Sequence, residues 1–141
     1  MAGRRKSRIL AFQTLYAWEQ NGRNTSGLLD FAWMPDSRRA RFGEDGLAFV
    51  RLIVSGTIEN IDGIDRIIRE NIKNWEISRL RRVDLSILRM SVYSLLYQPD
   101  IHPSIVIDEA VEIAMEYGTA DSYKFINGVL DAVRRRQKPQ D

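Results

Sequence analysis

Apolar residues recur every three or four positions along most of the chain, which is the spacing of an amphipathic α-helix. No stretch shows the sustained alternation of polar and apolar residues that a half-buried strand needs. The first helix is predicted from about Arg5 to Asn21. Gly22 should end it, because glycine adopts the left-handed conformation of a helix C-terminus without steric cost. The pattern therefore predicts an all-α fold.

The middle of the chain is predicted to hold a loop followed by a long helical segment. The polar and basic residues 35–46 are predicted to be the loop. From Glu44 onward, apolar residues recur at helical spacing as far as Ile72, with a break predicted near Gly63. Residues 83–97 carry another buried stripe and predict a further helix.

Proline and glycine mark the boundaries of the last two helices. Pro103 suits a first helical turn, where its missing N–H would have no partner, and Gly118 should end that helix. Asp121 or Ser122 should cap the last helix. Gly128 lies inside it, where glycine costs about 1 kcal/mol relative to alanine. We therefore expect close packing of another helix against Gly128.

Length and composition exclude several classes of function. The chain has 141 residues, 44% of them hydrophobic and 28% charged, which suits one globular domain. It has no cysteine and a single histidine, His102, which excludes disulfide scaffolds, thiolate nucleophiles and multi-histidine metal sites. No glycine-rich phosphate loop is found either. We predict no catalytic residue, no metal and no cofactor, and hence no enzyme.

The net charge of +2 conceals an uneven distribution. Two basic clusters without acids lie near the chain ends: Arg4, Arg5, Lys6 and Arg8, and Arg134 to Arg136 with Lys138. Residues 83–133 hold eight acids against two cations. This distribution predicts a basic and an acidic surface for two kinds of partner. The apolar run after the basic start is too short for a signal peptide or a membrane span, so we expect a cytoplasmic protein without membrane contact.

One face of the first helix combines groups that suit RNA. Arg5, Lys6, Ile9, Gln13 and Tyr16 fall within an arc of about 100° at 3.6 residues per turn. Cations neutralise phosphates, while amide and phenol groups hydrogen-bond to unpaired bases or stack on them. A solvated face, with Ile9 and Tyr16 in the core, is the alternative interpretation.

The helix after Pro103 carries the acidic face, and the next helix begins with a possible anion site. The acidic residues are Asp108, Glu109, Glu112 and Glu116. Like charges at i,i+4 cost roughly 0.2–0.5 kcal/mol per pair, which a basic protein partner would relieve. A solvated face is the alternative, and a carboxylate metal site is not favoured without histidine. The amides at the start of the last helix can bind an anion beside Lys124, whereas Phe125 is more typical of a core.

These motifs, in this order, resemble the NusB family of bacterial transcription antitermination factors. The resemblance spans almost the whole chain, beginning with the basic start. The other matching motifs are AFQTLY at residues 11–16, Trp75, VDLSILR at residues 83–89, IDEAVEIA at residues 107–114 with Tyr117-Gly118, and DSYKFINGVLD at residues 121–131.

The resemblance implies a single NusB-like domain over residues 1–141, built from two small packed helical bundles. Its N-terminal lobe would cover about 1–75 and its C-terminal lobe about 76–141. It implies binding to boxA-type single-stranded RNA of ribosomal RNA leader transcripts, as a heterodimer with the small-subunit ribosomal protein NusE. This pair would act in the RNA polymerase antitermination complex.

The resemblance also assigns site residues by matching position. The RNA contacts would be Arg4, Arg5, Lys6, Arg8, Gln13, Tyr16, Asp121, Ser122, Lys124 and Phe125. The protein-partner surface would be Asp84, Asp108, Glu109 and Glu112.

Two alternative functions stay open at this point. NusB-like domains also accompany ribosomal RNA methyltransferase domains, as accessory RNA-binding modules. In a purely structural role, the basic start and the acidic helix would instead pair between copies of this chain, giving a homodimer or larger homo-oligomer in the free protein.

Overall fold

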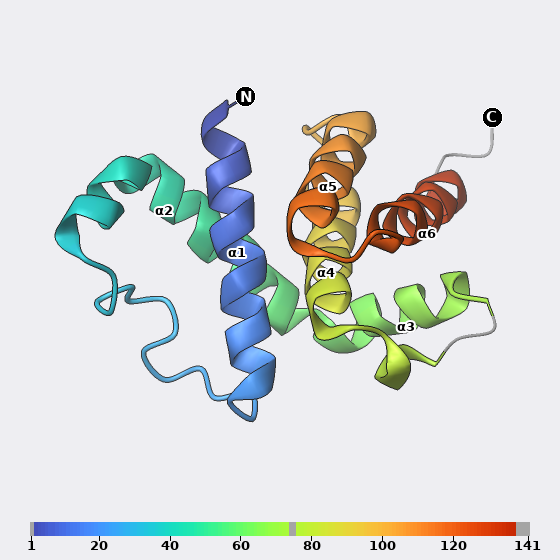
Figure 1. The fold of residues 1–141 in the computed structure, drawn as a ribbon, viewed down its shortest axis with the longest axis horizontal. Helices are drawn as coiled ribbons and strands as arrows, with labels where there is room; N and C mark the ends of the chain where they lie inside the picture. Colours follow the sequence, from blue (N-terminus) through green and yellow to red (C-terminus); the bar gives the residue numbers. More distant parts are fainter. Residues whose placement is uncertain (1, 74–75, 138–141) are drawn as a thin grey trace.

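The computed structural model describes residues 2–73 and 76–137, and this part of the chain contains six α-helices, one 3₁₀ turn and no strand (Figure 1). The predicted all-α class is confirmed. The elements are α1 (Ala2–Gln20), α2 (Asp36–Glu59), α3 (Ile61–Asn71), η1 (Ile77–Arg79), α4 (Arg82–Tyr97), α5 (Pro103–Tyr117) and α6 (Ser122–Gln137). Trp75 of the family motifs and Lys138 of the second basic cluster lie outside the described residues. No described helix is long and apolar enough to cross a membrane.

Helix α1 includes the basic start and ends within a residue of the predicted position. Gly22 has a φ of 71°, the left-handed conformation expected there. The N–H of Arg23 donates to the carbonyl of Trp18 at 2.8 Å and closes the last turn.

The predicted loop over residues 35–46 is wrong, because the chain is helical from Asp36. Only Gly43 interrupts the helix, with a φ of 69° and a ψ of 175°. The carboxylate of Asp36 lies in the first turn, where it favours the helix dipole, and it accepts a hydrogen bond from Arg39. Phe42 packs against the core. The polar composition therefore reflects a largely solvent-exposed helix.

The predicted break near Gly63 is also displaced, since α2 and α3 meet at Asn60. The side-chain Nδ2 of Asn60 donates to the carbonyl of Gly56 at 2.8 Å, and its backbone leaves the helical conformation, with a φ of −111° and a ψ of 20°. Gly63 lies inside the first turn of α3.

Helix α4 is the centre of the fold. It contacts α1, α2, α3, α5 and α6, and every residue from Asp84 to Ser94 is buried. Helix α2 crosses it closely at Gly56, where an added Cβ would lie 2.3 Å from the ring of Tyr93. Any larger residue at this crossing would force the Tyr93 ring to move.

Helix α5 begins and ends as predicted, and α6 begins at Ser122, one of the two predicted start residues. His102 caps α5, because its Nδ1 accepts from the N–H of Ser104 at 3.1 Å, and α5 ends before Gly118. The expectation for Gly128 is wrong, since an added Cβ there would meet nothing within 4 Å. Close packing occurs instead at Gly118, whose added Cβ would lie 2.5 Å from the Cβ of Ser122.

One continuous hydrophobic core includes residues of all six described α-helices. Helix α3, which the predicted division places in the N-terminal lobe, contacts α4 and α6 as well as α2. The division into two lobes at residue 75 stays a prediction.

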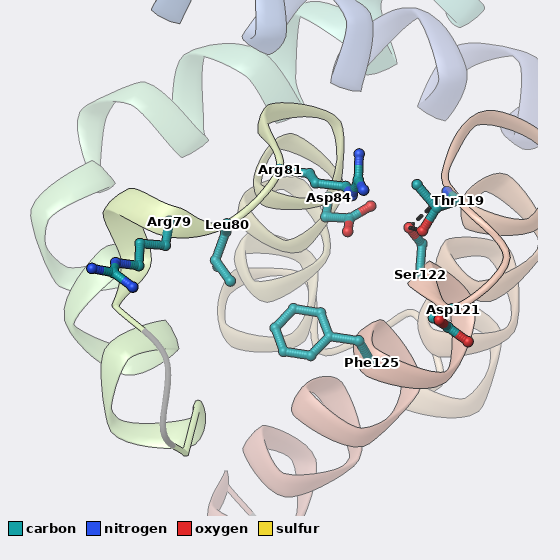
Figure 2. Close-up of a pocket in the computed structure, with 8 residues that line it drawn as sticks. All are labelled: Arg79, Leu80, Arg81, Asp84, Thr119, Asp121, Ser122 and Phe125. Atoms are coloured by element: carbon teal, nitrogen blue, oxygen red, sulfur yellow. Dashed lines mark hydrogen bonds between the residues drawn. The ribbon is translucent and has the colours of Figure 1, made fainter.

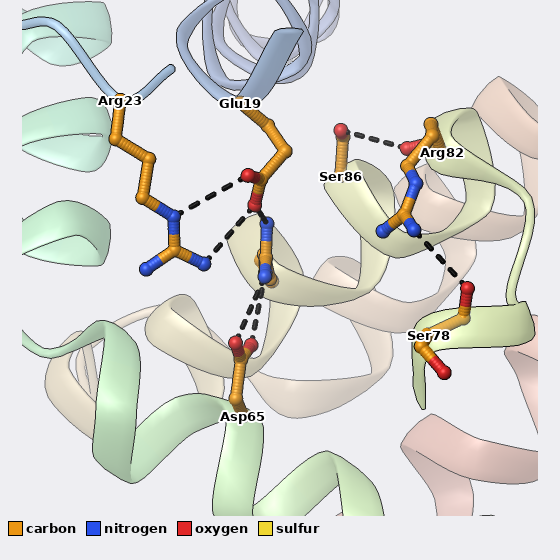
Figure 3. A network of polar contacts seen from close by, with 7 residues as sticks. Glu19, Arg23, Asp65, Ser78, Arg82 and Ser86 are labelled. Carbon is orange, nitrogen blue, oxygen red and sulfur yellow. Dashed lines mark hydrogen bonds and ion pairs between the residues drawn. The ribbon is translucent and has the colours of Figure 1, made fainter. Parts of the chain in front are cut away.

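A buried ionic network joins α1, α3 and α4 (Figure 3). The side chain of Arg89 is 4% exposed. Its Nε and Nη2 atoms donate to the two carboxylate oxygens of Asp65 at 2.9 and 2.8 Å, and Nη1 donates to Glu19 at 2.8 Å. Burial alone would lower the pKa of Arg89, but the hydrogen bonds to Asp65 and Glu19 raise it above its ordinary value.

Substituting Arg89 should remove much of the stability of the fold. Arg89→Ala leaves the carboxylates of Asp65 and Glu19 without their buried partner, which we expect to cost about 3–5 kcal/mol in the free energy of unfolding. Urea denaturation measures this loss. The matched control is Arg135→Ala, which breaks an exposed ion pair with Asp131 and should cost less than about 1 kcal/mol. Equal losses in the two variants would contradict the role given to Arg89.

Candidate functional site

The start of α6 and the start of α4 enclose a pocket of about 510 Å³ (Figure 2). Four of the predicted site residues line it: Asp84, Asp121, Ser122 and Phe125. Asp84 was assigned to the protein partner and the other three to RNA. The structure therefore brings members of the two predicted surfaces to one place.

An adjoining hollow of about 390 Å³ extends this pocket towards α1 and α5. It is lined by Tyr16 and Tyr117, and it shares Arg81, Asp84 and Thr119 with the first pocket. We call the two together the central groove. Tyr16 and Phe125 come from opposite ends of the sequence, and the fold places both along this groove.

Asp84 is a buried carboxyl group in the wall of the groove. It is 6% exposed, and its Oδ1 atom has no hydrogen-bond partner among the described residues. Burial raises the pKa of Asp84 above its ordinary value, and the hydroxyl of Ser122 and the charge of Arg81 offset this only in part. The wall of the groove therefore holds a buried carboxyl oxygen that the described residues leave without a partner.

Ser122 is held in place by the turn that precedes α6. Its Oγ accepts from the N–H of Thr119 at 2.9 Å and lies 3.1 Å from the Thr119 hydroxyl. Phe125 is half-buried, so its ring both packs against the core and lines the groove. Lys124 is exposed outside the groove, with its Nζ 5.9 Å from the centre of the Tyr123 ring.

Three arginines at the groove were missed by the sequence analysis. Arg79, Arg81 and Arg82 are exposed, and each lines one or both hollows. The sequence feature that could have identified them is the presence of three cations within four residues at the start of a predicted helix. They give the mouth of the groove a positive charge.

The cations of the first basic cluster have different environments. Arg8 is only 2% exposed, with its guanidinium 5.3 Å from the centre of the Phe49 ring, and Arg4 lies over the same ring at 4.1 Å. Burial lowers the pKa of Arg8, while Glu109 opposes this. Lys6 is exposed to solvent. Of these three, Lys6 is therefore the most accessible to a phosphate.

Arg5 connects the basic cluster with the acidic helix. Its Nη1 donates to Glu112 at 2.7 Å and its Nη2 donates to Glu116 at 3.1 Å, in exposed ion pairs. Asp108 is exposed, whereas Glu109 is partly buried near Arg8. The pairing that the homo-oligomer hypothesis places between copies thus forms within one chain.

Two apolar residues on α5 lie exposed beside the acids. Ile105 is 49% exposed and Met115 is 59% exposed. The sequence analysis did not select either residue, because each continues the apolar content of an amphipathic helix. Their exposure became apparent only from the packing of α5 in the folded structure, where neither side chain is part of the core.

The remaining candidates lie away from the central groove. Gln13 lines a separate hollow between α1 and residues 21–34. His102 serves as a helix cap, and no group of three or more potential metal ligands is found among the described residues.

Comparison with known proteins identifies the family that this chain resembles. The model of the NusB family matches residues 5–135. The chain is 51% identical to the transcription antitermination protein NusB of Treponema denticola over 134 residues, which cover 95% of this chain and 97% of that protein. It is 39% identical to the protein of the same name from Borreliella burgdorferi, over 93% of each chain.

Two solved structures are similar over nearly their whole length. A structure of T. maritima NusB superposes with a TM-score of 0.85 at 33% identity, covering 96% of this chain and 93% of that one. A structure of the antitermination factors NusB and NusE in complex with double-stranded RNA gives a TM-score of 0.83 at 27% identity, covering 96% of this chain and 98% of that one.

Replacing the buried carboxyl group should stabilise the protein at neutral pH. Because the pKa of Asp84 is raised in the folded state, stability falls as the pH rises from the unfolded pKa through the folded one. Asp84→Asn removes this loss. Its midpoint of urea unfolding should therefore exceed that of the wild type at about pH 7, and the difference should vanish near pH 3, where both side chains are neutral. Asp100→Asn, at an exposed site, is the control and should change little. A less stable Asp84→Asn at pH 7 would refute this.

Proposed function

Because this chain belongs to the NusB family, we propose that it is a transcription antitermination factor that binds boxA-type single-stranded RNA of ribosomal RNA leader transcripts together with NusE. The observation that carries the proposal is the central groove, which has Phe125 in one hollow, Tyr16 in the other, and Asp84 and the exposed Arg81 in both. We place its action in the cytoplasm, in the RNA polymerase antitermination complex and without catalysis of its own.

The chemistry of the groove suits an unpaired RNA strand. Aromatic rings such as Tyr16 and Phe125 provide stacking surfaces for splayed bases, and hydroxyl and carboxyl groups read base edges. The exposed arginines and Lys6 supply charge for phosphates, which gives affinity without sequence specificity. The similar structure with NusE and double-stranded RNA supports an RNA ligand.

The protein partner is proposed to dock on α5. Asp108 and Glu112 are exposed there between Ile105 and Met115, so the surface combines negative charge with apolar area. Such a surface suits a basic protein, because opposite charges steer association while apolar contact adds affinity. NusE, a ribosomal protein, fits that description.

The alternatives receive less support. The Treponema and Borreliella relatives are named antitermination proteins and match over nearly their whole length, which does not favour an accessory module of a methyltransferase. Arg5 already pairs with Glu112 and Glu116 inside the chain, so a homo-oligomer is not needed to satisfy these charges.

The RNA proposal is tested by titrating boxA-like and scrambled single strands. The wild type should prefer the boxA-like strand. Lys6→Ala and Arg81→Ala should each weaken binding to both strands and reduce the salt slope by roughly 0.7 for each phosphate that the variant no longer neutralises. Arg135→Ala, in the basic cluster without an assigned ligand, is the matched control. Equal and weak binding of the two strands, unchanged by either variant, would refute specific RNA recognition.

Arg5 can reach a phosphate only by leaving its two glutamates. Glu112→Gln combined with Glu116→Gln should therefore tighten RNA binding, by up to about fivefold, since exposed ion pairs contribute at most about 1 kcal/mol. The gain should disappear when Arg5→Ala is added, which separates release of Arg5 from a general loss of negative charge. The control pair Asp62→Asn with Glu70→Gln removes two exposed acids from α3. An equal gain in that pair would contradict the role of Arg5.

A further inference from the structure

A second hollow, of about 380 Å³, lies outside the central groove, between α1 and the connection over residues 21–34. In Figure 1 this connection runs from the end of α1 to the start of α2. Leu10 and Leu28 contribute apolar surface, and the polar lining includes the side-chain amides of Gln13, Asn21 and Asn24. None of its lining residues is ionisable. Its chemistry therefore suits an uncharged polar group rather than a phosphate.

Trp33 forms part of this lining and is unusually exposed. Its side chain is 60% exposed, whereas Trp18 of α1 is 3% exposed. An indole exposed to this extent forgoes most of the hydrophobic stabilisation that a large ring gains by burial. An aromatic surface beside amide groups is the combination that holds unpaired bases in RNA-binding proteins.

The backbone two residues before Trp33 is strained. Phe31 has a φ of 53°, in the left-handed region that aromatic residues rarely adopt, and its side chain is completely buried. The Trp33 ring meets the edge of Phe31 at 6.3 Å and 61°. The guanidinium of Arg38 lies 5.9 Å from the centre of the Trp33 ring, so a positive charge lies beside the indole.

The amide of Asn24 is oriented by its own loop. Its Oδ1 accepts from the N–H of Ser26 at 2.9 Å, which fixes the side chain and leaves the amino group to donate to a ligand. Gln13 projects from α1 into the same hollow. Amide side chains pair with the adjacent donor and acceptor on a base edge, as they do with adenine.

We propose that this hollow is a nucleobase site for single-stranded RNA, with Trp33 as the stacking surface and Asn24 and Gln13 as the groups that hydrogen-bond the base edge. The inference rests on the proposed function. It extends the RNA path across α1. The path would begin at Tyr16 in the central groove, pass over the face of α1 that carries Gln13 and Lys6, and end at the hollow. Arg38 beside Trp33 and the exposed Lys6 of α1 would supply positive charge for the neighbouring phosphates.

Titration of a boxA-like strand long enough to cross α1 tests the proposal. Trp33→Ala should weaken binding about fivefold or more, the lower end of the contribution of one stacked base. Trp33→Phe should retain most of the affinity, because its ring still stacks. Asn24→Ala should weaken binding as well. The matched control is Tyr97→Ala, which removes an aromatic side chain that is 51% exposed at the C-terminal end of α4. Thermal unfolding confirms that each variant is folded.

Tryptophan fluorescence gives an independent measurement. Addition of RNA should quench the emission of the wild type, and Trp33→Phe should abolish the quenching while still binding RNA. If the wild type binds the strand and Trp33→Ala behaves like Tyr97→Ala, this inference is overturned and the proposed function stands. If the wild type binds no single-stranded RNA, the proposed function fails. Quenching by the basic protein partner alone, and not by RNA, would assign the hollow to protein contact and overturn the inference.

Discussion

The buried guanidinium of Arg89 is the interaction on which the arrangement of the helices depends. A charge that is 4% exposed persists only if opposite charges surround it, and these come from Glu19 of α1 and Asp65 of α3. The network therefore links both α1 and α3 to the centre of α4. Arg23 adds a second cation to Glu19, with hydrogen bonds of 3.3 and 3.1 Å (Figure 3). Hydrophobic burial is non-directional, whereas the hydrogen bonds of this network require defined distances and angles.

The central groove follows from that arrangement. The start of α4 faces the start of α6, which packs on α3, α4 and α5, and Tyr16 of α1 lines the adjoining hollow. Asp84 lies at this point with an unpartnered buried oxygen, which is uncommon in a well-packed protein. The groove thus keeps a buried carboxyl group that destabilises the free protein at neutral pH, a cost that functional sites commonly carry.

The two charged surfaces are adjacent rather than independent. Arg5 of the basic cluster pairs with Glu112 and Glu116 of the acidic helix, so the proposed RNA surface and the proposed protein-partner surface share these side chains. In the proposed assembly, a basic partner that pairs with the glutamates would release Arg5 for RNA. The proposed nucleobase hollow at Trp33 is lined by further residues of α1, so this helix would carry RNA contacts at more than one place.

The sequence by itself determined the all-α class, the C-terminal end of α1, both ends of α5, the start of α6, and the family, because helical periodicity, glycine and proline signals and long motifs are local properties. Predictions from the sequence were wrong where a polar stretch or a glycine had a different structural reason from the one expected. The polar residues 35–46 are the solvent side of a helix, and Asn60 rather than Gly63 ends α2 through its side-chain hydrogen bond. Gly128 has open space around it, although its place in a helix predicted close packing.

Only the tertiary structure decided which candidate side chains are available to a ligand. In the sequence, the four cations of the first basic cluster cannot be told apart by their surroundings. In the structure, Arg8 is buried, Arg4 lies over an aromatic ring, Arg5 is ion-paired and Lys6 is exposed. The exposure of Trp33 could likewise not be predicted from the sequence. The same holds for the position of Tyr16, Asp84 and Phe125 along one groove. These properties depend on contacts between residues far apart in the chain, and periodicity along one helix carries no information about the helix that packs against it.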